Sequence, residues 1–204
     1  MCKLYLYEGG APHGKNAYQL IEMAAAMYMA EASFDVLEGR DSSATDEPTE
    51  FLHKEFLHED RSFEIAVTEK GKPYFVNLPL EFSVTNSGKL WMCAISENPC
   101  GLDLQVAKEG IPYEKLAKRF YKPIEYQYVK KFGEAAFFKV WTRREAYGKM
   151  IGEGFWGDIP ALVNDDLTLV DKVGEYNLSE IEVGDGVYCS LCTSDDEPYE
   201  IVLL

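Results

Sequence analysis

The stretch "WTRREAYGKM", from Trp141 to Met150, gathers two arginines and a lysine around one acid. On a helix, Trp141, Glu145 and Lys149 recur every four residues and form one stripe. Two interpretations fit this spacing. One is an exposed Glu–Lys pair on a solvated helix, worth about 0.2–0.5 kcal/mol. The other is a carboxylate and an ammonium group that together hold a metal ion and a phosphate.

A second acid favours the metal interpretation. The segment "CGLDLQ" places Asp103 in the middle of an apolar strand, where an unpaired carboxylate is costly. Magnesium is commonly held by one or two carboxylates together with the phosphates of a substrate. Asp103 on a strand and Glu145 on a helix are therefore candidate ligands of one shared cation.

A glycine-rich motif near the start offers a competing phosphate site. "GGAPHGKN" has the G-x-x-x-x-G-K spacing of a phosphate-binding loop and lies between a predicted strand and a predicted helix. However, Asn16 stands where a Ser or Thr would bind magnesium. We favour a turn with a helix cap, and a nucleotide-phosphate enzyme built on the Gly9–Lys15 loop stays an alternative.

Two further motifs have the residue types of metal ligands but not the full set. Cys189 and Cys192 in "CSLC" have zinc-ligand spacing, but the chain offers no second pair, and positions three apart on a strand point to opposite faces. His53 and His58 in "HKEFLH" lack a third ligand. We interpret these residues as two strand thiols and two surface histidines.

The elements that position these residues alternate between strands and helices. "CKLYLY" predicts a strand, "NAYQLIEMAAAMYMAEA" a helix capped by Asn16, and "EGRDSSATDEPTE" a loop. Short strands are expected in "FEIAVTEKGKPYF", "LEFSVTNSG", "KLWMCAIS" and "GLDLQVA". Helices at about 112–121, 123–132 and 135–151 precede C-terminal strands in "LTLV", "YNLSEIEV", "GVYCSLC" and "YEIVLL". The match of "GKLWMCAISENP" to "GVYCSLCTSDDEP" hints that the second half repeats the first.

The charge of the chain limits its partners. It has 35 acidic and 20 basic residues among 204 and a formal net charge of −15. Such a chain offers no net cationic footprint for nucleic acid, so any anionic ligand needs a local basic cluster. We find no signal peptide and no apolar run long enough for a membrane span. Five cysteines fit reduced thiols, and we expect a cytoplasmic protein.

Five short motifs in order resemble the 4′-phosphopantetheinyl transferases of the two-lobed, single-chain type. They are "GKP", "FSVTNSG", "GLDLQ", "AKRFY" followed by Glu125, and "WTRREAYGK". The corresponding family patterns read approximately G-K-P, F-N-x-S-H-S-G, G-[IV]-D-[IV]-E, R-F-F and W-x-x-K-E-[AS]-x-x-K. No single motif is specific, but five in the right order are hard to explain by chance. The resemblance covers about residues 71–154.

The resemblance implies an activity and a fold. Members of this family transfer the phosphopantetheine arm of coenzyme A to a serine of an acyl or peptidyl carrier protein, with magnesium, and release adenosine 3′,5′-bisphosphate. The implied fold is α+β, with two similar lobes in pseudo-twofold relation. We expect an N-terminal lobe at 1–99 and a C-terminal lobe at 100–204, with coenzyme A in the cleft between them.

The resemblance also implies roles for individual residues. Asp103 and Glu145 match the magnesium-binding acids, and Gln105 stands where the family often has a third acid. Lys149 matches a lysine at the coenzyme A phosphates, and Glu145 is the best candidate to take the proton of the acceptor serine. The residues expected to act in catalysis are Asp103, Glu145 and Lys149, and those expected to bind coenzyme A are Lys72, Thr85, Asn86 and Lys149.

Three departures from the family pattern weaken the expected site. Gln105 brings no charge to the metal, Asn86 replaces a histidine at the 3′-phosphate, and Arg144 replaces a lysine with a different geometry. A degenerate member that binds coenzyme A or a partner without catalysis is therefore a second interpretation.

A cationic segment suggests where a partner docks. Carrier proteins of this class are acidic, so an acidic enzyme needs a local positive patch to meet them. Between 108 and 122 the cations outnumber the acids, and the candidate docking residues are Lys115, Lys118, Arg119 and Lys122. A solvated amphipathic helix is the alternative. We expect a monomer.

Overall fold

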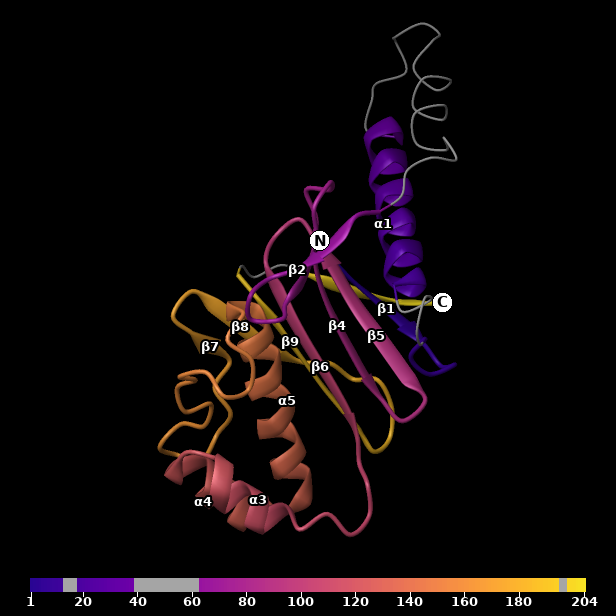
Figure 1. The fold of residues 1–204 in the computed structure, drawn as a ribbon. Helices are drawn as coiled ribbons and strands as arrows, with labels where there is room; N and C mark the ends of the chain where they lie inside the picture. The colour runs from indigo at the N-terminus through magenta and orange to yellow at the C-terminus, as the bar shows by residue number, and fades with distance from the viewer. Residues whose placement is uncertain (13–17, 39–62, 195–197) are drawn as a thin grey trace, which may run out of the picture.

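The computed structural model describes residues 1–12, 18–38, 63–194 and 198–204, with side chains left out at 33–38. Helices and strands are mixed along the chain (Figure 1), so the predicted α+β class is confirmed. The strands are β1 (Cys2–Tyr7), β2 (Ile65–Val67), β3 (Pro73–Phe75), β4 (Glu81–Ser87), β5 (Leu90–Ser96), β6 (Cys100–Val106), β7 (Lys172–Val173), β8 (Tyr176–Glu180), β9 (Val187–Thr193) and β10 (Tyr199–Leu203). The helices are α1 (Gln19–Glu38), α3 (Tyr113–Phe120), α4 (Pro123–Phe132) and α5 (Glu134–Ile151).

Two four-stranded sheets form the centre of the molecule. The first has the strand order β10-β1-β5-β4 and the second the order β6-β9-β8-β7, while β2 and β3 form a separate hairpin. The sheet changes between β5 and β6, close to the expected lobe boundary at residue 99. The last strand, β10, returns to the first sheet and pairs in parallel with β1. The division into two lobes in pseudo-twofold relation stays a prediction.

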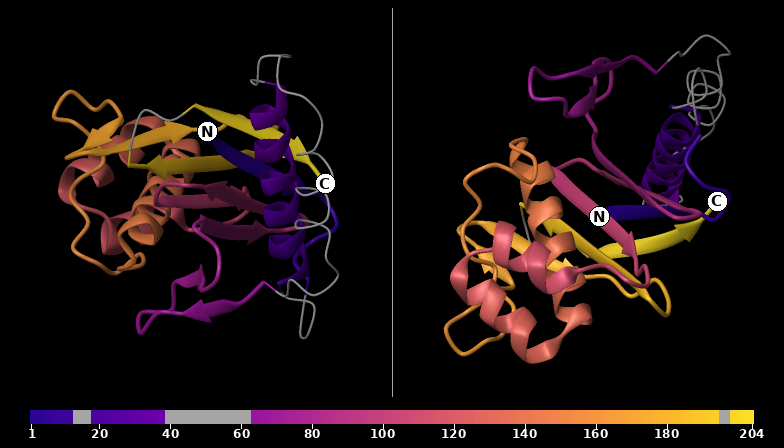
Figure 2. Two further views of the ribbon diagram at one scale, coloured as in Figure 1. Left: turned by 90° about the horizontal axis from the view of Figure 1, so that it is seen from above. Right: turned by 60° about the horizontal axis from the view of Figure 1, so that its bottom comes forward.

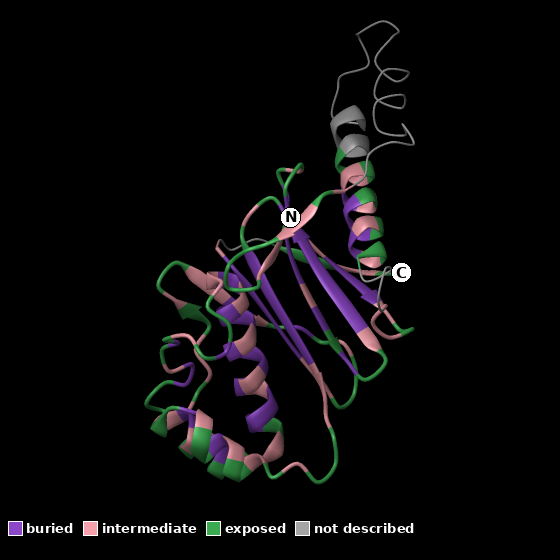
Figure 3. Ribbon diagram, in the orientation of Figure 1, coloured by how far each residue is buried: buried purple, intermediate pink, exposed green. Residues whose placement is uncertain are grey.

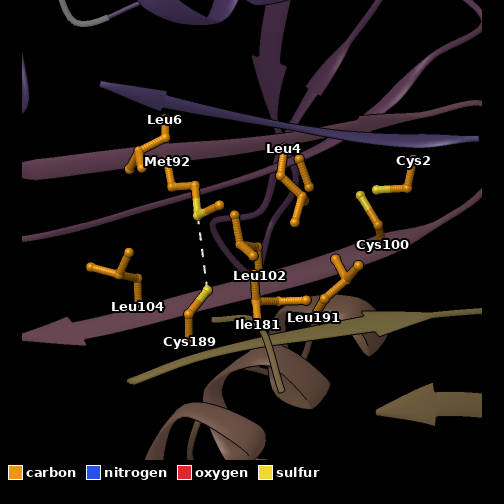
Figure 4. Close-up of a cluster of buried hydrophobic side chains, with 11 residues drawn as sticks. Cys2, Leu4, Leu6, Met92, Cys100, Leu102, Leu104, Ile181, Cys189 and Leu191 are labelled. Carbon is orange, nitrogen blue, oxygen red and sulfur yellow. Dashed lines mark hydrogen bonds between the residues drawn. The ribbon is translucent and has the colours of Figure 1, made fainter. Parts of the chain in front are cut away.

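The strand periodicity produces a core of several layers. Leu4 and Met92 from the first sheet face Leu102 and Leu191 from the second in one buried cluster (Figure 4). The residues that alternate with them, such as Tyr5 and Trp91, turn to the opposite face of the first sheet and pack with α1. Helix α5 covers the second sheet, and the helix pair α3–α4 lies against one end of α5 (Figures 2 and 3).

Most of the expected elements are present. The helices α3, α4 and α5 agree with the three predicted stretches to within one residue at each end. Cys189 and Cys192 are buried free thiols of β9 that belong to two different core clusters, as expected for opposite faces of a strand. The segments that look alike, starting at Gly88 and Gly186, both begin with a left-handed glycine that leads into a strand, β5 or β9.

Several sequence predictions fall outside the described residues. These are the proposed phosphate-loop residues Lys15 and Asn16, residues 39–50 of the predicted acidic loop, and the histidines His53 and His58. Within the described part of the chain, no helix has both the length and the apolar composition for crossing a membrane.

Helix α5 lies unusually close to β6, and a glycine allows this approach. A Cβ atom placed on Gly101 would lie 2.0 Å from the carbonyl oxygen of Ala146 and 2.5 Å from the backbone nitrogen of Met150. Both atoms belong to the backbone of α5, so no side-chain rotation can relieve the clash. The glycine of "CGLDLQ" therefore fixes the distance between the strand of Asp103 and the helix of Glu145.

We predict that Gly101→Ala destabilises the fold by about 3 kcal/mol, because the added methyl group forces α5 away from β6. Urea unfolding followed by circular dichroism measures this loss. Gly184→Ala is the matched control, since its Cβ would meet no atom within 4 Å and its φ is not positive. Equal stability of the two variants would show that the close approach is not a constraint.

Candidate functional site

Hydroxyl groups of β4 join the two sheets at their edges. The backbone N–H groups of Leu102 and Leu104 in β6 donate to Ser83 Oγ and Thr85 Oγ1, at 2.9 and 3.1 Å. Val106 N donates to Ser87 Oγ at 3.0 Å in the same way. The alternating hydroxyl residues of "FSVTNS" thus replace a backbone ladder between the two strands. We name this line of contacts the β4–β6 seam.

Asp103 lies at the seam and is only 3 % exposed. Its Oδ1 accepts hydrogen bonds from Lys149 Nζ at 2.9 Å and from Thr85 Oγ1 at 3.1 Å. Its Oδ2 lies 3.4 Å from Gln105 Nε2. The carboxylate expected to be costly in an apolar strand is therefore held by a cation and two polar side chains.

Lys149 is fixed by more than one partner. Besides Asp103, its ammonium group donates to the carbonyl oxygens of Leu102 at 2.8 Å and of Val84 at 3.4 Å. It pairs with Asp103 and not with Glu145, one turn earlier on α5. Trp141, Glu145 and Lys149 are half-buried, and Lys149 pairs with Asp103, so the exposed Glu–Lys pair that we considered does not form.

Glu145 lies beside this pair without a partner of its own. Burial raises the pKa of Glu145, the neighbouring Asp103 carboxylate raises it further, and Lys149 partly opposes both effects. Within the described part of the chain, the Glu145 carboxylate makes no hydrogen bond or ion pair. Two carboxylates that repel each other, one of them with free oxygens, form an arrangement that a cation would stabilise.

A cavity of about 260 Å³ opens beside Glu145 and Lys149. Lys70 and Lys72, at the turn before β3, line its other side. Lys72 Nζ contacts the Met150 carbonyl at 3.4 Å and the Glu81 carboxylate at 3.9 Å. Three lysines in a chain of net charge −15 make this cavity a local site for an anion.

The donor set fits a magnesium ion with two protein carboxylates. Magnesium needs oxygen ligands and keeps open positions for water or phosphate. Asp103 and Glu145 supply the carboxylates, while Gln105 presents its Nε2 to Asp103 and its Oε1 to Ser87, 3.5 Å from the hydroxyl. No group of three or more His, Cys, Asp or Glu side chains suited to a metal occurs among the described residues. The role of Gln105 as a third ligand stays a prediction.

Two of the residues expected to bind coenzyme A lie next to each other on β4 but point to opposite faces of the strand. Thr85 is buried and touches Asp103, whereas Asn86 is exposed and points to the other face of the strand. Lys72 lines the same cavity as Glu145 and Lys149. The structure therefore brings together Lys72, Thr85, Asp103, Glu145 and Lys149, but not Asn86.

A buried ion pair between α4 and α5 lies next to the site. Arg144 Nη1 lies 3.2 Å from both carboxylate oxygens of Glu125, which is fully buried at the start of α4. Glu125 also accepts the backbone N–H groups of Lys122 and Leu162, at 2.8 and 2.9 Å. The pair ties α4 and a later loop to α5 next to Glu145. The motif order had marked Glu125 and Arg144 separately, and the place of Glu125 three residues after Lys122 suits a helix-capping acid, but neither signal predicts that the two residues pair.

We predict that Arg144→Met and Glu125→Gln each destabilise the protein by about 3–5 kcal/mol, because each leaves a buried group without its partner. Chemical unfolding monitored by circular dichroism tests this, with the exposed Glu114→Gln as control. The double variant should lose less than the sum of the two single losses. Additive losses would mean that the two residues act independently.

Comparison with known proteins finds similarity over the part of the chain that holds this site. Residues 99–179 match the model of the 4′-phosphopantetheinyl transferase superfamily. A 4′-phosphopantetheinyl transferase, gsp, from Aneurinibacillus migulanus is 32% identical over 140 residues, which cover 61% of this chain and 56% of that protein. A 4′-phosphopantetheinyl transferase from Bacillus subtilis is 34% identical over 94 residues, 44% of this chain and 41% of its own length. The chain thus spans about half the length of these relatives.

Proposed function

With the resemblance to the 4′-phosphopantetheinyl transferase superfamily confirmed over residues 99–179, we propose that this protein transfers the 4′-phosphopantetheine arm of coenzyme A to a serine of an acyl or peptidyl carrier protein. The main support for this proposal is the arrangement of charged side chains at the cavity. Asp103, Glu145 and Lys149 meet at one end of a cavity whose other side is lined by lysines. This arrangement suits a ligand with several phosphates and a metal ion.

The lysines account for binding of coenzyme A. Lys72 and Lys70 on one side of the cavity and Lys149 on the other supply positive charge to the pyrophosphate and the 3′-phosphate. Lys72 and Lys149 are held by backbone carbonyls, so little side-chain entropy is lost when a phosphate binds. Lys70 forms an ion pair with Glu153 and has to release it to reach the ligand.

The carboxylates account for the chemistry. Asp103 and Glu145 would hold Mg²⁺, which supplies charge compensation at the pyrophosphate when bound. Asp103 is already bonded to Lys149 and Thr85, whereas Glu145 lines the cavity with its carboxylate unpaired in the described residues, so Glu145 accepts the proton of the serine hydroxyl. The serine oxygen bonds to the phosphorus that carries the pantetheine arm, and the bond from this phosphorus to the bridging oxygen breaks. Adenosine 3′,5′-bisphosphate leaves with that oxygen.

We predict that Asp103→Ala and Glu145→Ala each abolish transfer, whereas Gln105→Ala causes a smaller loss because the amide carries no charge. The measurement is the rate at which an apo-carrier gains the arm from coenzyme A in the presence of Mg²⁺. Asp165→Asn, an exposed acid away from the cavity, should be unchanged. Higher activity of Gln105→Glu would show that the missing third acid limits the enzyme. Small and equal losses for Asp103 and Glu145 would contradict the two-carboxylate site.

We propose that the carrier docks at α3 and the residues just after it. Lys115, Lys118 and Arg119 are exposed on α3, and Lys122 is exposed just before α4. They form a local cationic surface on an acidic protein, which is what attracts an acidic partner. The four residues lie outside the cavity lining, so this surface is distinct from the coenzyme site.

We predict that reversing Lys115 and Lys118 to Glu slows association with an acidic carrier by about tenfold and flattens its dependence on salt, since exposed charges act mainly on the encounter rate. Stopped-flow association at two ionic strengths measures both effects. Reversal of Lys130 and Lys131, two exposed lysines at the end of α4, is the matched control. Affinity for coenzyme A should not change. If the α3 variant associates with the carrier at the wild-type rate and with the wild-type salt dependence, α3 is a solvated face that binds no carrier.

A further inference from the structure

Trp156 is the most exposed large hydrophobic side chain in the described part of the chain, at 76 %. It follows α5 in the segment 152–157, which also contributes Gly152 and Gly154 to the lining of the cavity. A tryptophan whose side chain stays in solvent adds little to the stability of the fold, because most of its apolar surface is not buried. Its position next to a proposed reaction site therefore suggests a partner.

Aromatic contacts hold the Trp156 ring in place. Its ring centre lies 5.1 Å from that of Phe120 and 5.1 Å from that of Phe155, edge-on in both cases. Phe155 is buried and stacks on Trp141 at 4.5 Å. The indole thus stands on a packed aromatic base and projects outward. A rigid aromatic side chain loses little entropy on binding, which is why tryptophan is enriched among the residues that dominate binding energy.

Two cations lie beside the same surface. Phe120 is the last residue of α3, and the guanidinium of Arg119 lies 5.0 Å above its ring. Lys122 is exposed two residues after Phe120, in a long 3.8 Å contact with Asp158, which lies two residues after Trp156. We call Phe120 and Trp156, with the cations Arg119 and Lys122, the aromatic–cationic face. An apolar centre with a charged rim is the composition of a protein-binding surface.

We propose that the aromatic–cationic face binds an acidic amphipathic helix of the apo-carrier, with the Trp156 indole as the central apolar contact. This inference rests on the proposed transferase function and adds to the α3 charges a residue from another segment of the chain. The negative side chains of such a helix meet Arg119 and Lys122, and its apolar side covers Trp156 and Phe120. The acceptor serine is thereby brought close to the segment whose Gly154 lines the cavity together with Glu145.

The geometry favours a protein helix over a nucleotide base as the occupant. Trp156 does not line the cavity that Lys72, Glu145 and Lys149 share, although Gly154, two residues earlier, does. Its ring contacts are Phe120 of α3 and Phe155, so the indole stands on the α3 side of the segment. Stacking of the coenzyme A adenine on Trp156 is the competing outcome, and the experiment separates the two.

The test compares Trp156→Ala with Phe132→Ala in binding and in transfer. Phe132 is also an exposed aromatic, 49 % accessible and next to two lysines, but it ends α4. The binding probe is an apo-carrier that the wild type modifies, with its acceptor serine replaced by alanine so that no transfer occurs. We expect Trp156→Ala to weaken carrier binding about tenfold or more, with unchanged affinity for coenzyme A and an unchanged unfolding temperature. Phe132→Ala should bind like the wild type.

Fluorescence gives a second, independent readout. Trp91 is 2 % exposed and Trp141 is half-buried, so Trp156 dominates quenching of tryptophan emission by acrylamide. The serine-to-alanine carrier should protect the wild type from quenching and have no such effect on Trp156→Ala. Coenzyme A alone should give no protection.

The outcomes are distinct. Carrier binding by Trp156→Ala equal to that of the wild type, with transfer intact, would overturn the role of Trp156 and leave the proposed function standing. Protection by coenzyme A alone, together with weaker coenzyme binding in the variant, would assign the indole to the adenine and also overturn the inference. A wild-type protein that modifies no carrier in a panel of apo-acyl and apo-peptidyl carrier proteins would overturn the proposed function and this inference with it.

Discussion

The buried charge of Asp103 is the constraint on which the rest of the site depends. A carboxylate at this depth is tolerated only if hydrogen bonds and an opposite charge replace its lost hydration. Lys149 from α5 and Thr85 from β4 do this, and both also bind the backbone of the seam. Satisfying one carboxylate thus fixes the first sheet, the second sheet and α5 relative to one another. The close approach of α5 at Gly101, two residues earlier, is part of the same arrangement.

Helix α5 uses its two sides for different tasks. Glu145 and Lys149 face the cavity, whereas the two arginines before them turn into the protein. Arg144 meets Glu125 of α4, and Arg143 donates to the Val170 carbonyl and pairs with Asp171 at 3.5 Å. The two buried arginines therefore anchor the helix, which keeps Glu145 positioned although its own carboxylate has no partner in the described residues. This explains why an acidic chain gathers so many cations around one glutamate.

The sequence allowed the elements and the main contacts to be predicted, but not the pairing within the site. The three helices and the meeting of Asp103 with the Glu145–Lys149 stripe followed from periodicity and motif order. The alternation of side chains along β4 could also have shown that Thr85 and Asn86 point apart. Which carboxylate pairs with Lys149 depends on the register of β6 against α5, and that register is set by packing at Gly101 rather than by local spacing. The exposure of Trp156 likewise depends on tertiary contacts with α3.

The most direct measurement is intact-mass analysis after incubation of the protein with coenzyme A, Mg²⁺ and a panel of apo-acyl and apo-peptidyl carrier proteins. The account predicts that at least one carrier gains the mass of the phosphopantetheine arm, that chelation of Mg²⁺ prevents this gain, and that adenosine 3′,5′-bisphosphate appears in equal amount. Binding of coenzyme A without a mass gain on any carrier would contradict it, and would identify a chain that keeps the lysine-lined cavity but has lost the transfer chemistry.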